Sequence, residues 1–332
     1  MIDAHHHLWQ PARGDYGWMS PADPVLYRPY RLADALAQFD RHGVGQSVLV
    51  QAAPTTAETE YLLGIADSSE RIGAVVGWID FEDPAQRARL ERFAAHPRFR
   101  SVRPMVQDLD DDWLARPALQ WAFDAVRACD LAFDALGYPK HAPRFLERLQ
   151  RYPELRVVVD HALKPATALP AIDTAACGAA AFDTWARDIE RIATETAAFC
   201  KLSGLVTEIR RDRGRPAGAV PAGAVPAGVV SAEAVRTAAR GASGASGDAD
   251  LDAMQAALQP VVDHLLAVFG ARRLMWGSDW PVCRLACEYG DWLALARRLT
   301  AHCSAEDRAA IFGGTARAFY RIAPLGAAAT AD

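Results

Sequence analysis

Apolar and polar positions follow two different patterns along the chain. Eight short runs are rich in Val, Ile, Leu and Phe, which is typical of strands buried on both faces. The runs span residues 2–9, 46–52, 72–79, 99–103, 131–136, 155–161, 199–204 and 273–278. Between them, apolar residues recur at intervals of three and four, as on a helix with one buried face. The pattern predicts strands and helices in alternation.

The helical segments carry signals of their own. Leu32, Leu36 and Phe39 share one face of a helix, and Pro84 stands where a first helical turn tolerates proline. Ser304 is followed three residues later by Asp307, which resembles a helix start. Further helices are expected over residues 58–68, 84–95, 113–129, 143–152, 183–196 and 258–269.

This order of elements predicts one fold. Parallel strands joined through helices make right-handed crossovers, and eight such units close into a barrel. Barrels of this kind reach 332 residues as a single unit. We therefore expect residues 1–332 to form one α/β domain, a TIM-like (β/α)8 barrel.

One segment departs from the pattern. Residues 216–230 spell PAGAV, PAGAV and PAGVV, and residues 238–247 are rich in Ala, Gly and Ser. Proline every fifth residue excludes a regular helix, and small side chains bury too little surface to offset the entropy of ordering. Residues 211–250 are expected to be a flexible insertion after the seventh strand. Leaving the barrel at its C-terminal face, it acts either as a lid or as a neutral expansion in solvent.

Composition and charge narrow the choice of partner. Hydrophobic residues make up 51% and charged residues 23% of the chain, and the net charge is -5, so neither nucleic acid nor an acidic membrane surface is expected. The sequence contains no leader-like or membrane-spanning apolar run. Its six cysteines are scattered, a usage that favours a reducing compartment. We expect a cytoplasmic protein with a small-molecule partner and leave its oligomeric state open.

Candidate chemistry comes from the first and last strands. His5 and His7 are two residues apart, so in an extended strand their imidazoles share one face and His6 faces away. Asp279 directly follows the last strand and can act as a general base or ligate a cation. Two simpler explanations compete: Asp279 caps a helix, and the histidines belong to an expression tag. The tag explanation fits poorly because strand-like sequence continues on both sides.

Two further strand ends carry polar groups, Arg103 after the fourth strand and His161 after the sixth. The C-terminal ends of barrel strands meet at one mouth, so both side chains are expected there. The alternatives are a structural ion pair of Arg103 with Asp108 or another acid, and a packed core role for His161. Lys164 and Lys201 are weaker candidates that also fit solvated surface lysines.

Aromatic residues stand near the same strand ends. Trp9, Trp78 and Trp280 follow or end three strands, and Gln51 lies at the end of the second. Aromatic walls with a few polar anchors suit small organic ligands, and sugar-like rings in particular. Tryptophans in such positions are more often part of the core. We assign these four residues to substrate binding.

Five segments together resemble the amidohydrolase superfamily. They are IDAHHHLW (2–9), SVRPMVQD (101–108), VVVDHALKP (157–165), CKLSGLVTE (200–208) and RLMWGSDWPV (273–282). The resemblance is to its lactonase branch, which includes L-fuconolactonase-like and L-rhamnonolactonase-like sugar lactonases and the dicarboxylate lactonases of aromatic degradation. It covers nearly the whole chain outside residues 211–250. A His-x-His pair alone is a weak signal, whereas five segments in this order are specific.

The resemblance implies a reaction. His5, His7 and His161 would surround the carbonyl end of the site. Asp279 would activate a water, and Arg103 would stabilise the developing oxyanion. The expected activity is hydrolysis of a sugar lactone such as an L-fucono- or L-galactonolactone. The alternatives are a lactonase or decarboxylase for a carboxylated ring, and a sugar-binding barrel without catalysis.

Departures from the superfamily bear on metal content. The fourth strand ends in Arg103, where other members have a lysine or glutamate that bridges two metals, and strand 131–136 ends without a histidine. Both features argue against a binuclear centre. A single divalent ion, with zinc as the preferred choice, fits His5, His7 and Asp279, because three nitrogen and oxygen ligands leave one position open. The requirement for metal is left open.

Overall fold

Eight parallel strands form the centre of the protein. The computed structural model describes residues 1–165, 167–168, 175–210 and 246–326. Each barrel strand pairs with the next one along the sheet. The strands are β1 (Ile2–His6), β2 (Gln46–Val50), β3 (Ile72–Gly77), β4 (Phe99–Val102), β5 (Ala132–Ala135), β6 (Val157–Val159), β8 (Phe199–Leu202) and β10 (Leu274–Trp276). Every strand lies within its predicted range, and the (β/α)8 barrel is confirmed.

The first and last strands meet just beyond the end of β10. The backbone N–H of Asp279 donates to the carbonyl of His5 at 2.7 Å, and the N–H of His7 donates to the carbonyl of Trp280 at 2.7 Å. We call this junction the seam. It brings the two ends of the sequence together, as the predicted site requires.

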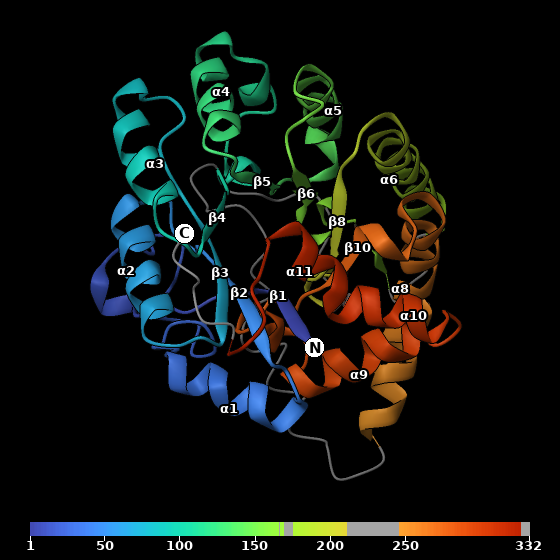
Figure 1. Ribbon diagram of the computed structural model, residues 1–332. Helices are drawn as coiled ribbons and strands as arrows, with labels where there is room; N and C mark the ends of the chain where they lie inside the picture. Colours follow the sequence, from blue (N-terminus) through green and yellow to red (C-terminus); the bar gives the residue numbers. More distant parts are fainter. Residues whose placement is uncertain (166, 169–174, 211–245, 327–332) are drawn as a thin grey trace.

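Helices surround the strands (Figure 1). In the described part of the chain, none is long and apolar enough to cross a membrane. The helices are α1 (Leu32–His42), α2 (Thr56–Asp67), α3 (Arg87–Ala94), α4 (Gln120–Ala128), α5 (Ala142–Arg151), α6 (Ala175–Glu195), α8 (Ser246–Phe269), α9 (Tyr289–Leu299), α10 (Ala305–Ala309) and α11 (Thr315–Phe319). The helix start predicted at Ser304 is confirmed, because its Oγ accepts the N–H of Asp307 at 3.0 Å.

Some element boundaries differ from the prediction. The helix expected over 113–129 is broken near Pro117, and only Gln120–Ala128 is α-helical, because proline interrupts a regular helix. Residues 246–250, assigned to the insertion, belong to α8. Residues 211–245, the rest of the predicted insertion, lie outside the described residues. The short parallel pair of β7 (Thr167–Ala168) and β9 (Ile209–Arg210) was not predicted.

The barrel interior has an apolar layer and a polar layer. Towards the N-terminal ends of the strands, small and branched side chains such as Val48 and Val76 pack against Phe319, Tyr320 and Ile322 from the end of the chain. This C-terminal segment, residues 319–322, fills the lower end of the barrel, and we call the segment the plug. The polar layer lies above it, towards the C-terminal ends of the strands, and contains the candidate site.

Candidate active site

Three imidazoles surround one carboxylate at the mouth of the barrel. Oδ1 of Asp279 lies 3.3 Å from Nε2 of His7, 3.7 Å from Nε2 of His5 and 3.9 Å from Nε2 of His161. Nε2 of His5 and Nε2 of His7 are 3.1 Å apart. All four side chains are buried. Residues in or just after β1, β6 and β10 therefore converge as predicted, and we call this group the histidine–aspartate cluster.

A bulge in β1 determines the direction in which its histidine side chains point. The pairing of β1 with β2 shifts register between Asp3 and His6, and such a bulge re-aims side chains. His5 and His7 point into the cluster, whereas Nε2 of His6 contacts Oγ of Ser47 on the outside of the barrel at 2.9 Å. The prediction that His6 faces away is confirmed.

A left-handed turn delivers His161. The φ angles of His161, Ala162, Leu163 and Lys164 are 54°, 50°, 58° and 54°, and that of Asp279 is 53°. For residues other than glycine, this left-handed backbone conformation costs about 1–2 kcal/mol per residue. Strain of this kind is found where surrounding structure enforces a functional geometry. Here it places both His161 and Asp279 at the mouth.

The His161 ring is fixed from two sides. Its Nδ1 lies 2.8 Å from Oγ of Ser203. Gly204, whose φ is +63°, lies against the ring, and a Cβ added there would be 2.5 Å from Nδ1. A larger residue at this position would have to displace the imidazole.

Burial sets the protonation of the cluster. It lowers the pKa of His161 to about 4 and holds the pKa of His5 well below its usual value, because a buried imidazole loses the hydration of its charged form. Burial alone would raise the pKa of Asp279, but the His161 and His7 rings outweigh it and that pKa is lowered. At neutral pH the Asp279 carboxylate therefore faces uncharged His5 and His161 rings.

The cluster offers suitable ligand atoms for one cation. Ligand atoms of His5, His161 and Asp279 all lie within 4.8 Å of one another. Nδ1 of His7 donates to the carbonyl of Val50 at 2.8 Å, which leaves the Nε2 lone pair directed at the cluster. Imidazole nitrogen and carboxylate oxygen are the donors that a divalent ion such as Zn²⁺ accepts. The residues fit such an ion.

A chain of buried charges lies directly below. Nζ of Lys201 is 2.5 Å from Oδ2 of Asp134, 2.8 Å from Oδ1 of Asp160 and 3.1 Å from Nδ1 of His5. Arg103 pairs with the other oxygen of Asp160 at 3.3 Å. We call Arg103, Asp134, Asp160 and Lys201 the buried ion chain. Lys201 is fully buried, so the surface-lysine alternative is wrong for it.

The buried ion chain is close to neutral. Two cations face two carboxylates, which is how buried charge is tolerated. Burial alone would raise the pKa of Asp160, yet Lys201, His5 and Arg103 hold it well below its usual value. The structural ion pair considered for Arg103 is formed, with Asp160 as its partner.

A pocket of about 160 Å³ opens onto the cluster. This volume equals several water molecules at about 30 Å³ each, so it suits a small ring. Trp9, Arg103, His161 and Asp279 line it, as predicted. Other side chains in its wall are His7, Trp18, Met105, Asp108, Tyr138 and Lys164.

Three predicted substrate contacts lie elsewhere. Gln51, Trp78 and Trp280 are not among the described residues that line this pocket. Nε2 of Gln51 donates to the carbonyl of Arg103 at 2.6 Å and so supports that strand end. The Trp280 ring packs edge-on against Tyr30, with centroids 5.0 Å apart, as in the core role considered for the tryptophans.

Sequence reasoning missed several residues of the site. Asp134 lies in the apolar segment LAFDAL, and an acid there is a detectable signal because a buried carboxylate needs a partner. Asp160 directly precedes His161 in VVVDHALKP, and no role was predicted for it. Trp18 and Tyr138 come from loops, where no strand or helix periodicity marks a residue as facing the pocket.

Comparisons with known proteins identify the family. The family model described as Amidohydrolase matches residues 2–322. An L-fucono-1,5-lactonase of Burkholderia ambifaria is 38% identical over 326 residues, covering 97% of this chain and 95% of that protein. An L-fucono-1,5-lactonase of Burkholderia multivorans is 32% identical over 330 residues, covering 97% and 96%.

A solved structure is also similar. The crystal structure of an amidohydrolase from Burkholderia multivorans with bound zinc is 31% identical, with a TM-score of 0.75, and the match covers 97% of this chain and 99% of that one. Both the match to the family model and these identities extend over almost the full length. The chain belongs to the amidohydrolase family.

Proposed function

We propose that the protein hydrolyses a sugar lactone of the L-fucono- or L-galactonolactone type to the aldonic acid. The observation that carries this proposal is the Asp279 carboxylate, buried among three imidazoles on the floor of a small pocket with tryptophan in its wall. The two L-fucono-1,5-lactonases at 38% and 32% identity support the substrate class.

In the proposed reaction, Asp279 removes a proton from a water molecule as the water attacks the ring carbonyl. Its lowered pKa keeps it ionised at neutral pH, so the acceptor is available. The ring C–O bond then breaks, and the ring oxygen takes up the proton held by Asp279 and leaves as a hydroxyl. The imidazoles keep the carboxylate oriented and exclude bulk water.

Arg103 is proposed to stabilise the negative charge on the carbonyl oxygen. It lines the pocket and is almost fully buried, so its charge is little screened by solvent. Asp160 and Gln51 hold its terminal nitrogens. The guanidinium is thus oriented before substrate arrives.

A divalent metal ion, with zinc preferred, is proposed to occupy the histidine–aspartate cluster. His5, His7, His161 and Asp279 would hold it through their imidazole nitrogens and carboxylate oxygen. Such an ion supplies Lewis acid polarisation of the carbonyl. The zinc in the Burkholderia multivorans structure supports this assignment.

The charges around the pocket favour a neutral polyol over a carboxylated ring. Of the two cations in the wall, Arg103 is paired with Asp160 at 3.3 Å and Lys164 lies 3.9 Å from Oε1 of Glu208. Asp108 adds a negative charge to the same wall. A substrate carboxylate would find little uncompensated positive charge there.

A pH-indicator assay tests the proposal. L-fucono-1,5-lactone, L-galactonolactone and a dicarboxylate lactone are compared with and without EDTA, and the rate without protein is subtracted. We expect the highest kcat/KM on a neutral sugar lactone, loss of rate with EDTA and recovery on adding zinc. Preference for the dicarboxylate lactone would favour the aromatic-degradation alternative. Absence of hydrolysis with all three would refute the proposed function.

A further inference from the structure

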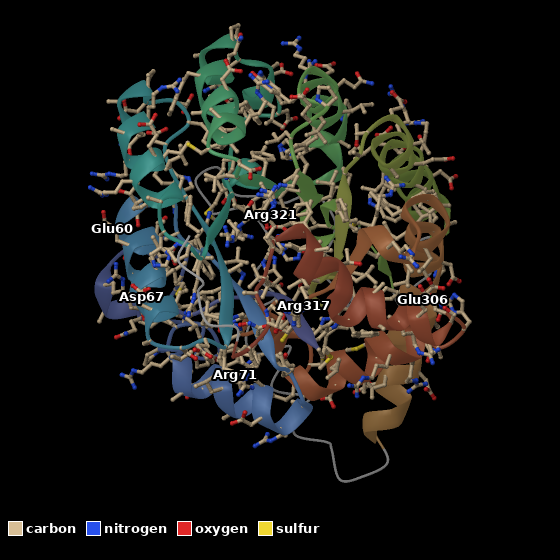
Figure 2. All side chains as sticks on the ribbon, viewed as in Figure 1. Glu60, Asp67, Arg71, Glu306, Arg317 and Arg321 are labelled. Carbon is tan, nitrogen blue, oxygen red and sulfur yellow. The ribbon has the colours of Figure 1, made fainter. Side chains whose placement is uncertain are left out.

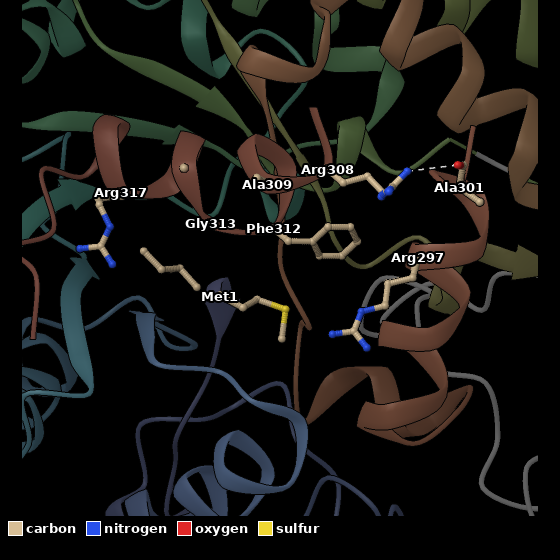
Figure 3. Close-up of a pocket in the computed structure, with 10 residues that line it drawn as sticks. Met1, Arg297, Ala301, Arg308, Ala309, Phe312, Gly313 and Arg317 are labelled. Carbon is tan, nitrogen blue, oxygen red and sulfur yellow. Dashed lines mark hydrogen bonds between the residues drawn. The ribbon is translucent and has the colours of Figure 1, made fainter. Parts of the chain in front are cut away.

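A second and larger cavity lies at the opposite end of the barrel. Its volume is about 770 Å³, within the range of roughly 300–1,000 Å³ that small-molecule sites occupy. It is lined by the start of β1, by α9, and by the region from α10 to α11. Figure 3 shows Met1 and Phe312 at its centre, with Arg317 and Arg297 on opposite sides. We call it the lower cleft.

Three arginines line the lower cleft. Arg297, Arg308 and Arg317 come from α9, α10 and α11, and no acidic side chain is among the described residues of the lining. In the described part of the chain, none of the three forms an ion pair within 4 Å. Their positive charges are therefore uncompensated within the cleft.

Neutral acceptors orient two of these arginines. Arg317 donates to the carbonyl of Ile322 and to Oε1 of Gln46, each at 3.1 Å. Arg308 donates to the carbonyl of Ala301 at 3.2 Å. These contacts fix the guanidinium groups without cancelling their charge. A preoriented cation loses less entropy when it binds an anion.

The positive charge of the lower cleft contrasts with the negative net charge of the whole chain. The chain as a whole carries a net charge of -5, and Figure 2 shows Glu60, Asp67 and Glu306 towards the outer edge while Arg317 lies near the middle of the same face. A hollow lined by one sign of charge concentrates counter-ions. Phe312 and Met1 add apolar surface beside the arginines.

We propose that the lower cleft is a binding site for a small organic anion, with a phosphate or carboxylate head and a short apolar body. Guanidinium groups match both heads through paired N–H donors, and the apolar body would rest on Phe312. This site is distinct from the catalytic pocket and does not rest on the proposed lactonase activity. The simpler explanation, arginines that gather by chance on a solvated surface, predicts no saturable binding.

Calorimetric titration of the full-length protein tests the proposal. Phenyl phosphate and benzoate serve as probes at low ionic strength, where electrostatic binding is least screened, and benzyl alcohol is the uncharged comparison. We expect saturable binding of at least one anionic probe and none of benzyl alcohol. The R297Q/R317Q variant should bind about tenfold more weakly or worse, since it loses two charge-assisted contacts.

Arg298→Gln is the matched control. Arg298 is next to Arg297 in α9 but pairs with Asp252 outside the cleft, so its loss removes the same charge and should change affinity by less than about twofold. Should R297Q/R317Q be unstable by circular dichroism, the single R297Q variant, at an exposed position, should still weaken binding several-fold. Wild-type affinity in R297Q, an equal loss in R298Q, or no saturable binding to the wild type would overturn the proposal.

Discussion

The two ends of the barrel handle charge in opposite ways. At the mouth, cations and carboxylates are buried in contact, as Lys201 is with Asp134 and Asp160. At the lower end, the plug is largely apolar, and in the described part of the chain Arg308 and Arg317 of the lower cleft donate only to neutral acceptors. Burying charged side chains at the upper end therefore costs folding free energy, whereas apolar packing at the lower end stabilises the fold. Changes at the two ends should separate activity from folding.

The largest effect is expected from Asp279→Asn. The amide keeps the shape of the side chain but cannot accept a proton, so kcat should fall by about 10²–10⁴-fold while the thermal unfolding temperature changes little. Lactone hydrolysis and calorimetry measure the two quantities. Asp108→Asn, the same change in another acid of the pocket wall, is the control and should retain most activity. Near wild-type turnover in D279N would require another base.

Lys201→Met should reduce both activity and stability. It leaves Asp134 and Asp160 without their shared cation, and breaking a buried ion pair costs about 3–5 kcal/mol. Hydrolysis should also slow because His5 loses a contact at 3.1 Å. Denaturant unfolding measures the free energy. The K201M/D134N double variant should recover part of it, since one buried charge has been removed; no recovery would argue against the pairing.

Phe319→Ala should act on folding alone. Phe319 is buried in the plug, and truncating a buried phenylalanine costs about 3–5 kcal/mol. Turnover per folded molecule should stay close to that of the wild type, as judged by active-site titration alongside denaturant unfolding. A large fall in kcat at full folding would mean that the two ends are not separable.

Tyr320→Phe is the smallest change and examines the link between the ends. The Tyr320 hydroxyl donates to Oδ2 of Asp134 at 2.7 Å, joining the plug to the buried ion chain. Its removal should lower the unfolding free energy by about 1.5–3 kcal/mol and leave kcat within about twofold. A fall in kcat comparable to that of K201M would show that the plug also orients the catalytic residues.

The fold could be predicted because its signal is local. A buried parallel strand is apolar along its whole length, and the eight runs could be counted directly. The strand ends then placed His5, His161 and Asp279 at one mouth. Helix 113–129 was overextended because its apolar spacing continues across Pro117.

The partners within the site could not be predicted in the same way. Lys201 lies in an apolar run that predicts a buried strand, but nothing in that run identifies its partners Asp134 and Asp160, which come from β5 and from the end of β6. Only the closure of the barrel brings these positions together. The left-handed turn at His161 has no sequence signal either, because it contains no glycine. Trp78 and Trp280 were assigned to substrate binding because pockets often have aromatic walls. Which indole ring faces the pocket depends on the packing of its neighbours, and the sequence does not show this.

The seam between β1 and β10 has a practical consequence for watching the protein at work. The amides of His7 and Asp279 form its backbone hydrogen bonds, while the side chains of the same two residues belong to the histidine–aspartate cluster. Any fluctuation that parts the first and last strands must also pull that cluster apart. The deuterium exchange rates of these two amides are therefore a built-in gauge of how often the reaction centre is disassembled.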